Sequence, residues 1–197
     1  CIRQHVDGPR APSVAVILSN LGNLYSRMGD YERSRGSLVE ALSIQEEVFG
    51  SRHPKLVNTL GNLAITEGSM GLPGQARFEQ TILVADETLG PSHPLAAQAR
   101  ANYGIALRDF DIVKARLLWE EALAVFTKAD GPTSPYALWV LELVGEGALL
   151  VGDLESAERD LRRAVAGHEE RPSPDLRDFA AALGVLGECL AEKGRTA

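Results

Sequence analysis

The sequence has few of the residues that build disulfide frameworks or metal sites. Its 197 residues include only two cysteines, Cys1 and Cys189, and four histidines. Neither a Cys-x-x-Cys nor a His-x-x-x-His pattern occurs, so the usual spacing of metal ligands is missing. Two cysteines do not make the framework of a small secreted domain, and a reducing compartment, the cytoplasm, is therefore expected.

Long apolar runs and basic clusters are also missing. No apolar segment approaches the roughly 20 residues that span a bilayer, and no signal-peptide pattern is present. Acidic residues exceed basic ones by 27 to 20, and the local group of Arg159, Arg162 and Arg163 is interleaved with Glu158 and Asp160. Nucleic acid requires clustered Lys and Arg. We therefore expect neither a membrane segment nor a nucleic-acid partner, and we expect these arginines on a solvated helix face.

A repeated motif is the strongest signal that the sequence does contain. The segment Gly50–Pro54 returns 40 residues later as Gly90–Pro94, and a related segment, Gly131–Pro135, follows after 41 more. Self-similarity at this period predicts supersecondary units that can bury their apolar faces only by stacking on one another.

Each repeat is predicted to be a pair of antiparallel helices. In the first repeat, Leu18, Leu21 and Tyr25 follow the helical period, Gly29 interrupts it, and a second apolar run stops near Gly50. A small residue in each first helix should let the two helices of a pair approach closely. The sequence thus predicts nine helices, as four hairpins over residues 12–53, 54–93, 94–134 and 135–173 and a final unpaired helix over 174–194.

The two ends of the sequence differ from this pattern. Residues 1–11 carry no periodicity and are expected to lie outside a single repeat domain formed by residues 12–197. The first residue is not methionine, and the last helix has an apolar face without a partner. We therefore expect a piece of a longer protein.

The stretches Leu18–Tyr25 and Leu89–Pro94 resemble the signature of the tetratricopeptide repeat. The form they resemble is the longer one of roughly 42 residues, found in kinesin light chains and many bacterial proteins. The resemblance extends over residues 12–194 and implies an all-α fold, a right-handed α-solenoid of stacked antiparallel helical hairpins with about four and a half repeats. It implies a scaffold for protein binding but not its partner, because a fold does not dictate an activity.

Asparagine occupies equivalent positions in three of the first helices. Asn20, Asn62 and Asn102 each lie two residues before the small residue of the helix, although asparagine is a mediocre helix former. In the family, first helices line the concave face, and asparagine there often hydrogen-bonds the backbone of an extended peptide, which an amide can match as donor and acceptor. The resemblance therefore implies a groove for a peptide or a partner's helix; alternatively, the asparagines cap neighbouring turns or derive from a duplicated ancestral unit.

Some members of the family hold a C-terminal carboxylate with Lys and Arg beside such asparagines. The corresponding positions here, four residues before each asparagine, are Val16, Asn58 and Gln98. Asn102 itself stands where that subset carries Arg. The carboxylate clamp is incomplete, and an internal segment or a helix is the expected ligand.

The same offset along the repeat adds further residues to the expected groove. Trp139, Glu142 and Glu146 fall on the concave side of the fourth repeat, as an anchor for a basic or aromatic segment. Arg27 and Arg108 are expected at the groove edge. Trp139 could instead fill the core between helices, as is expected of Trp119, which lies on a second helix.

No catalytic, cofactor or metal site is expected. His53 and His93 each precede a proline, where the imidazole can accept a hydrogen bond from an unpaired amide of the helix start. Cys189 has His168 upstream as a conceivable base, but its place near Leu186 on an apolar helix face predicts a buried, inert thiol.

Two functions therefore remain. The first is a non-enzymatic protein-protein interaction module. The alternative is a regulatory or oligomerising arm of a larger signalling ATPase or protease, which could also self-associate through its terminal helix.

Overall fold

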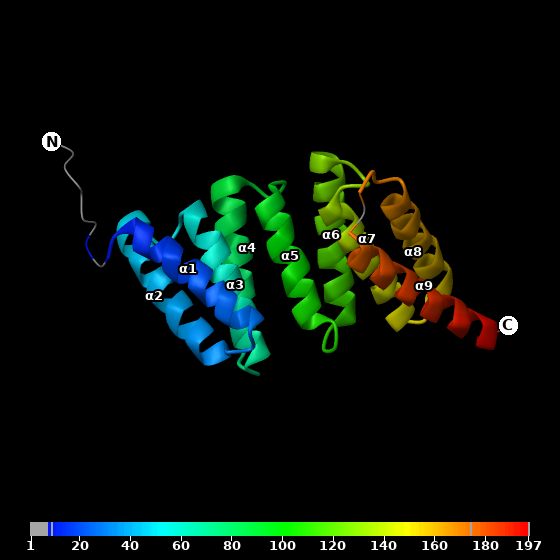
Figure 1. Cartoon of the computed structure of the whole chain (residues 1–197), viewed down its shortest axis with the longest axis horizontal. Coiled ribbons are helices and arrows are strands. Elements are labelled where there is room, and N and C mark those ends of the chain that lie inside the picture. Colours follow the sequence, from blue (N-terminus) through cyan, green and yellow to red (C-terminus); the bar gives the residue numbers. More distant parts are fainter. Residues whose placement is uncertain (1–7, 9, 174, 197) are drawn as a thin grey trace. The chain divides into compact units, whose positions relative to one another are not determined.

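The computed structural model describes residue 8, residues 10–173 and residues 175–196. Within this part of the chain it contains nine α-helices, one short 3-10 helix and no strand (Figure 1). The all-α class and the nine helices expected from the sequence are confirmed, whereas Cys1 and most of the segment 1–11 lie outside the described residues. In chain order the elements are α1 (Pro12–Arg27), α2 (Tyr31–Phe49), η1 (Pro54–Leu56), α3 (Val57–Ser69), α4 (Gln75–Leu89), α5 (Pro94–Leu107), α6 (Ile112–Asp130), α7 (Pro135–Leu150), α8 (Leu154–Glu169) and α9 (Leu176–Thr196).

The repeated glycines end the second helices of the first three hairpins. Gly50, Gly90 and Gly131 follow α2, α4 and α6 with φ of 84°, 93° and 89°. This backbone conformation is accessible to glycine without a steric penalty and disfavoured for other residues. The glycines of the repeated motif are therefore helix stops, as the sequence predicts.

The histidines of the same motif cap the helices that follow. Nδ1 of His53 accepts a hydrogen bond from the backbone N–H of Lys55 at 3.2 Å, and Nδ1 of His93 accepts one from Leu95 at 3.1 Å. Each bond satisfies an amide at the start of a helix that has no partner within the helix. The capping role predicted for the two histidines is confirmed.

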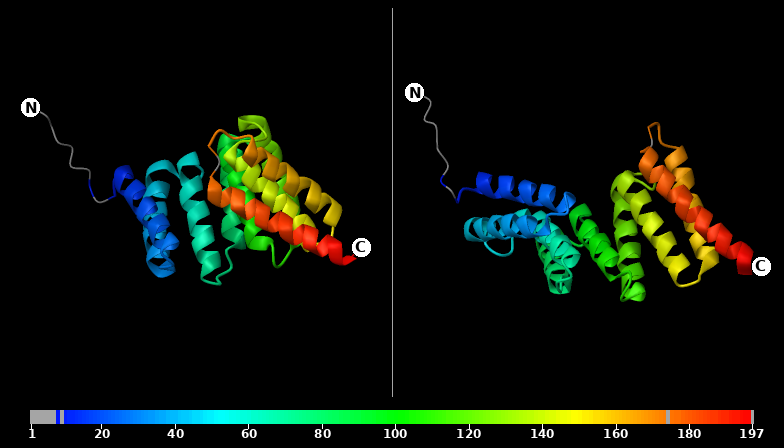
Figure 2. Two further views of the ribbon diagram at one scale, coloured as in Figure 1. Left: turned by 45° about the vertical axis from the view of Figure 1, so that its right-hand side comes forward. Right: turned by 60° about the horizontal axis from the view of Figure 1, so that its bottom comes forward.

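The chain divides into two compact units, the first ending at Ala99 and the second beginning at Arg100, within α5. In the first unit α1 packs against α2, α2 against α3, and α3 against α4 (Figure 2). Its core contains Leu38 and Leu60, both fully buried. A Cβ added to Gly22 would lie 2.5 Å from Cγ of Leu38, so the close approach of α1 and α2 requires a glycine at this position.

In the second unit α6 packs against α7, α7 against α8, and α8 against α9. Trp119 of α6 is fully buried, and its Nε1–H donates to the carbonyl oxygen of Ala101 at 3.2 Å. A Cβ added to Gly104 would overlap the indole ring, and one added to Gly147 would lie 2.9 Å from Cζ3. The prediction that Trp119 packs inside is confirmed, and two glycines make the space that it fills.

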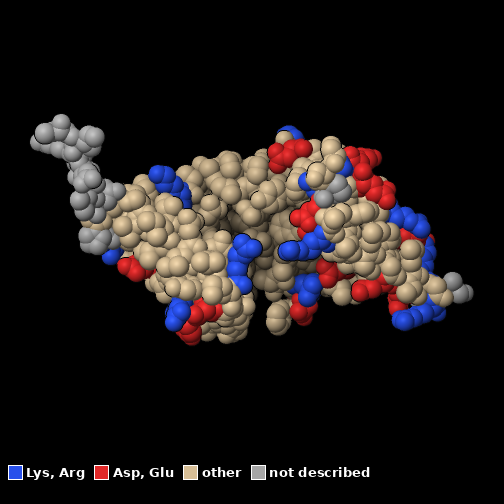
Figure 3. Space-filling model, in the orientation of Figure 1, with Lys and Arg blue, Asp and Glu red and all other residues tan. Residues whose placement is uncertain are grey.

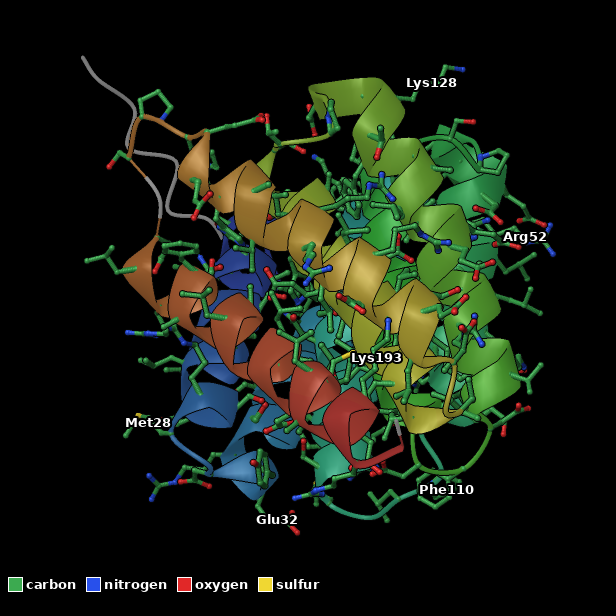
Figure 4. All side chains as sticks on the ribbon, turned by 90° about the vertical axis from the view of Figure 1, so that its right-hand side faces the viewer. Met28, Glu32, Arg52, Phe110, Lys128 and Lys193 are labelled. Carbon is green, nitrogen blue, oxygen red and sulfur yellow. The ribbon has the colours of Figure 1, made fainter. Side chains whose placement is uncertain are left out.

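The arginines of α8 are paired with acids. Arg163 lies 3.0 Å from Asp160, and Arg162 pairs with Glu158 one turn away. Lys193 of α9, labelled in Figure 4, also donates to Glu158 at 2.5 Å and so links α9 to α8. Figure 3 shows many Lys, Arg, Asp and Glu side chains on the surface of the second unit that faces the viewer. The interleaving of charges predicted for this helix is confirmed.

Cys189 provides a test of how α9 packs on α8. The side chain is fully buried, and its Sγ–H donates to the carbonyl oxygen of Leu154 at 3.7 Å. Burial raises the pKa of the Cys189 thiol, and the thiolate is the reactive form. We expect iodoacetamide to alkylate Cys189 at a negligible rate in native buffer and rapidly in urea, as followed by mass spectrometry of the peptide that contains it. Equal rates in the two solvents would contradict the packing of α9 described here.

Candidate functional site

In the first unit, two of the predicted asparagines lie on first helices that are in contact. Asn20 on α1 is exposed, and Asn62 on α3 is partly exposed. The two helices touch through Ser19 and Thr59, whose hydroxyl oxygens lie 2.7 Å apart. Both asparagine side chains are accessible to a ligand in this unit.

A hollow of about 310 Å³ lies beside Asn20. It has three sides: α1, the end of α2, and the segment from η1 into α3. Val16 and Asn58, the positions where clamp-type relatives are expected to carry cations, both line it. The full lining is Pro12, Val16, Ser19, Asn20, Gln45, Phe49, Lys55, Asn58 and Thr59. This volume is at the lower end of the range of ligand pockets.

Two residues of this hollow are absent from the residues predicted from the sequence. Gln45 of α2 is only 6% exposed, and its Oε1 has no hydrogen-bond partner among the described residues. The Lys55 ammonium lies 4.5 Å from the centroid of the Phe49 ring, which fixes a positive charge at the hollow. Both residues lie outside the periodic first-helix positions that the sequence pattern selects, so no signal in that pattern could have found them.

In the second unit, two of the predicted groove residues bind each other. Nη1 of Arg108, at the α5–α6 turn, donates to Oε1 of Glu146 on α7 at 2.9 Å, and Nε of Arg108 donates to Asp109 at 3.2 Å. The hydrogen bond with Asp109, followed by the charge of Glu146, raises the pKa of Arg108. The charges of Arg108 and Glu146 therefore largely neutralise one another. Asn102, which the sequence also places in the groove, lies on α5 and is partly buried.

Glu142 is directed toward the neighbouring helix. Its Oε1 lies 2.8 Å from Nε2 of the buried His168 on α8. Burial raises the pKa of Glu142 and Asp178 raises it further, while the hydrogen bond and charge of His168 act in the opposite direction. The Glu142 carboxylate thus serves the contact between α7 and α8 and is only 17% exposed.

Trp139 belongs to an aromatic group at the start of α7. Its ring meets that of Tyr136 edge-on with centroids 6.4 Å apart, and Tyr136 stacks on Phe126 of α6 at 5.1 Å. Trp139 is partly buried and Tyr136 is 49% exposed. The group forms a partly accessible aromatic surface.

Arg27, which the sequence places at the groove edge, is exposed in the last turn of α1.

The described residues contain no group of three or more His, Cys, Asp or Glu side chains that could hold a metal ion. Among these residues, no helix is both long enough and apolar enough to cross a membrane. The His53 and His93 side chains cap helices, and the pairs Glu142–His168 and Arg108–Glu146 connect α7 to its neighbours.

Comparison with known proteins identifies the repeat. Residues 13–78 match the model of the tetratricopeptide repeat family. The human "Clustered mitochondria protein homolog" is 28% identical over 138 residues, which are 65% of this chain and 10% of that protein. The chain therefore spans about a tenth of the length of this curated relative.

Solved structures share the fold over nearly the whole chain. The structure of BtubC (BKLC) from P. vanneervenii gives a TM-score of 0.82 at 19% identity and covers 93% of this chain and 74% of its own. A putative kinesin light chain from Podosopora anserina, with nearly identical TPR-like repeats, gives 0.78 at 19% identity, with coverages of 93% and 89%. The resemblance to kinesin-light-chain-like repeats and the solenoid fold class inferred from the sequence are confirmed.

Proposed function

We propose that this chain, a tetratricopeptide-repeat protein, is a binding module whose first helices hold an extended segment of a partner protein. Arrays of this fold generally act as protein-binding scaffolds. The observation that carries the proposal is the accessible pair Asn20 and Asn62 on two first helices in contact, beside a hollow that Asn20 itself lines.

The chemistry of these side chains suits an extended backbone. Each asparagine amide offers donors and an acceptor to a peptide group, which needs both. An extended segment exposes these groups without internal hydrogen bonds, and a helical array that is already folded leaves most of the ordering cost to the ligand. We assign the backbone contacts of the first unit to Asn20 and Asn62.

In the second unit we assign Asn102 to the same role and the selectivity for side chains to Trp139. Aromatic residues that are partly exposed contribute strongly to binding energy. Arg108 and Glu146 satisfy each other at 2.9 Å, so we propose that they flank this surface as a neutral pair. Glu142 we assign mainly to the contact with His168, and Arg27 to the edge of the first unit's surface.

The test starts from a peptide selected on the immobilised chain from a random 12-residue phage-display library. Changing Asn20→Leu together with Asn62→Leu should weaken that peptide's affinity about 30-fold, because two hydrogen bonds of about 1 kcal/mol each are lost. Fluorescence anisotropy of the labelled peptide measures the change. Leucine is a better helix former than asparagine, so the fold should persist and circular dichroism should be unchanged.

A matched control comes from the opposite helix of a hairpin. Gln75→Leu replaces an exposed amide on α4 and should leave the affinity unaltered. If the double asparagine variant binds the peptide with unchanged affinity, or if Gln75→Leu loses as much affinity as that variant, the binding surface does not lie on α1 and α3.

One observation favours the alternative, a regulatory or oligomerising arm of a larger protein. Leu176, Leu183 and Leu190 recur every seventh residue on α9 and are 75%, 46% and 40% exposed. Leucines at this spacing lie along one side of a helix, a surface that a second apolar helix could cover. Light scattering across a range of protein concentration separates self-association from binding by the monomer.

A further inference from the structure

We infer that α9 pairs antiparallel with α9 of a second copy of this chain, with the leucines of each helix lying over small residues of the other. Because the pairing involves the second unit alone, it goes beyond the peptide-binding function and does not depend on Asn20 or Asn62. It gives the alternative function a definite partner, a direction and a register.

One side of α9 alternates leucines with small residues, and all of them are exposed. Steps of three and four residues keep these side chains on one side of the helix. A Cβ added to either of the two glycines in this stripe would lie in open space. The α9 stripe consists, in order along the helix, of Leu176, Ala180, Leu183, Gly187, Leu190 and Gly194.

Glycines at the same place in other first helices are covered by a leucine. Gly145 of α7 lies 42 residues before Gly187, and a Cβ added to it would lie 2.7 Å from Cγ of Leu161 on α8. Gly22 of α1 meets Leu38 of α2 in the same way. Glycine is a poor helix former, and in α1 and α7 the close approach of a neighbouring helix requires it. Gly187 has the same position in the repeat, but no described residue covers it.

The contact between α7 and α8 shows how such helices interlock. Leu161 of α8 lies over Gly145 of α7, and in return Leu138 of α7 lies over Gly167 of α8, where an added Cβ would overlap Cδ2 of the leucine. The later residue on α7 meets the earlier one on α8, so the two helices are antiparallel. The two contacts are seven residues apart on α7 and six apart on α8.

The α9 stripe is complementary to itself in the same manner. When two copies of α9 run antiparallel with Leu183 opposite the second copy's Gly187, Leu176 falls opposite Gly194 and Ala180 opposite Leu190. Every leucine then faces a small residue, and two-fold symmetry repeats each contact. The leucine-over-glycine contacts of Leu176 and Leu183 are seven residues apart, the spacing that α7 uses against α8.

A parallel pair of α9 helices lacks this fit. In register it would set leucine against leucine and leave glycine facing glycine. It would also place the exposed Arg177 beside Arg177 and the exposed Glu188 beside Glu188, whereas the antiparallel register brings Arg177 of each copy toward Glu188 of the other. Shape and charge therefore favour the antiparallel direction.

Sedimentation velocity across protein concentration tests the pairing. One helix pair is a small interface, so we expect a weak dimer with a dissociation constant on the order of 100 µM, seen as the mass of two chains near 1 mM. Leu183→Glu buries a charge at the contact and should raise that constant at least about ten-fold. Leu117→Glu, the same change at a leucine of α6 that is 57% exposed, should leave it unaltered.

Gly187→Leu separates interlocking from a general apolar contact. The added leucine enlarges the apolar surface and favours the helix, so a contact driven by apolar area alone would become tighter. In the interlocked pair the new side chain collides with the second copy's Leu183, and the dissociation constant should rise at least about ten-fold. Gly36→Leu, at an exposed glycine of α2 that also has open space around it, is the matched control and should have no effect.

Cysteine cross-linking tests the register. In a Cys1→Ser background, oxidation of a mixture of the Leu183→Cys and Gly187→Cys proteins should join one chain of each kind, because only these two positions face each other. A parallel pair would instead join Leu183→Cys to itself, which would contradict the direction inferred here.

A chain that stays monomeric up to about 1 mM would overturn the inference and leave the α9 stripe to a helix of another protein. A dimer that Leu183→Glu does not weaken, or that Gly187→Leu tightens, would overturn it as well. Leu183→Glu should leave the affinity for the selected peptide unchanged, so the two proposals fail separately. A monomer that loses the peptide when Asn20 and Asn62 are changed contradicts only the pairing, whereas a dimer whose peptide affinity ignores those changes contradicts only the peptide surface.

Discussion

Replacing Trp119 with alanine should lower the free energy of unfolding by about 3–5 kcal/mol, the loss typical of a large buried aromatic side chain. The indole is fully buried and packs against Gly104 and Gly147. Because glycine has no side chain, neither residue could fill the cavity that the alanine variant would leave. The substitution also removes the donor that satisfies the carbonyl oxygen of Ala101. Urea unfolding followed by circular dichroism at 222 nm measures the change.

Trp139→Ala is the matched control for this experiment. Trp139 is only partly buried and meets Tyr136 edge-on at the start of α7. Its loss should cost clearly less than the loss of Trp119, because less surface returns to water and no enclosed cavity forms. A larger loss for Trp139 than for Trp119 would contradict the packing of the second unit described above.

Leu60→Ala should destabilise the first unit by about 2–5 kcal/mol. Leu60 of α3 is fully buried in a cluster with Leu38, Leu56 and Leu63, so its removal leaves a cavity among side chains from several elements. The same urea titration applies. Leu83→Ala, at a position on α4 that is 51% exposed, should cost much less, and equal costs for the two substitutions would be inconsistent with this core.

The fold could be predicted from the sequence because its signals are local. Gly50 stops a helix through its own backbone conformation, and His53 caps the next helix through an amide two residues away. Gly22 permits a close helix pair because its neighbour in space, Leu38, lies on the next helix of the same hairpin. Each of these effects involves residues within one repeat, which a repeating pattern makes visible.

The candidate site could be predicted only in part, because much of it depends on which partner a side chain reaches on a neighbouring helix. The offset along the repeat placed Glu142 with Trp139 and Glu146, but its carboxylate meets His168 of the next helix at 2.8 Å. An offset gives the position of a residue on its helix and not the partner that its side chain reaches. Gln45 was not predicted for the same reason, because it lines the hollow only where α2 meets α1 and α3.

The central claim is that α1 and α3 present asparagine amides to the backbone of a bound segment. The most direct test is to follow the side-chain NH₂ resonances of Asn20 and Asn62, assigned by their loss in the Asn20→Leu and Asn62→Leu variants, during titration with the selected peptide. We predict that both pairs of resonances shift with one dissociation constant, which matches the value from anisotropy. Resonances of Asn20 and Asn62 that stay fixed while residues of α2 and α4 shift would contradict the account.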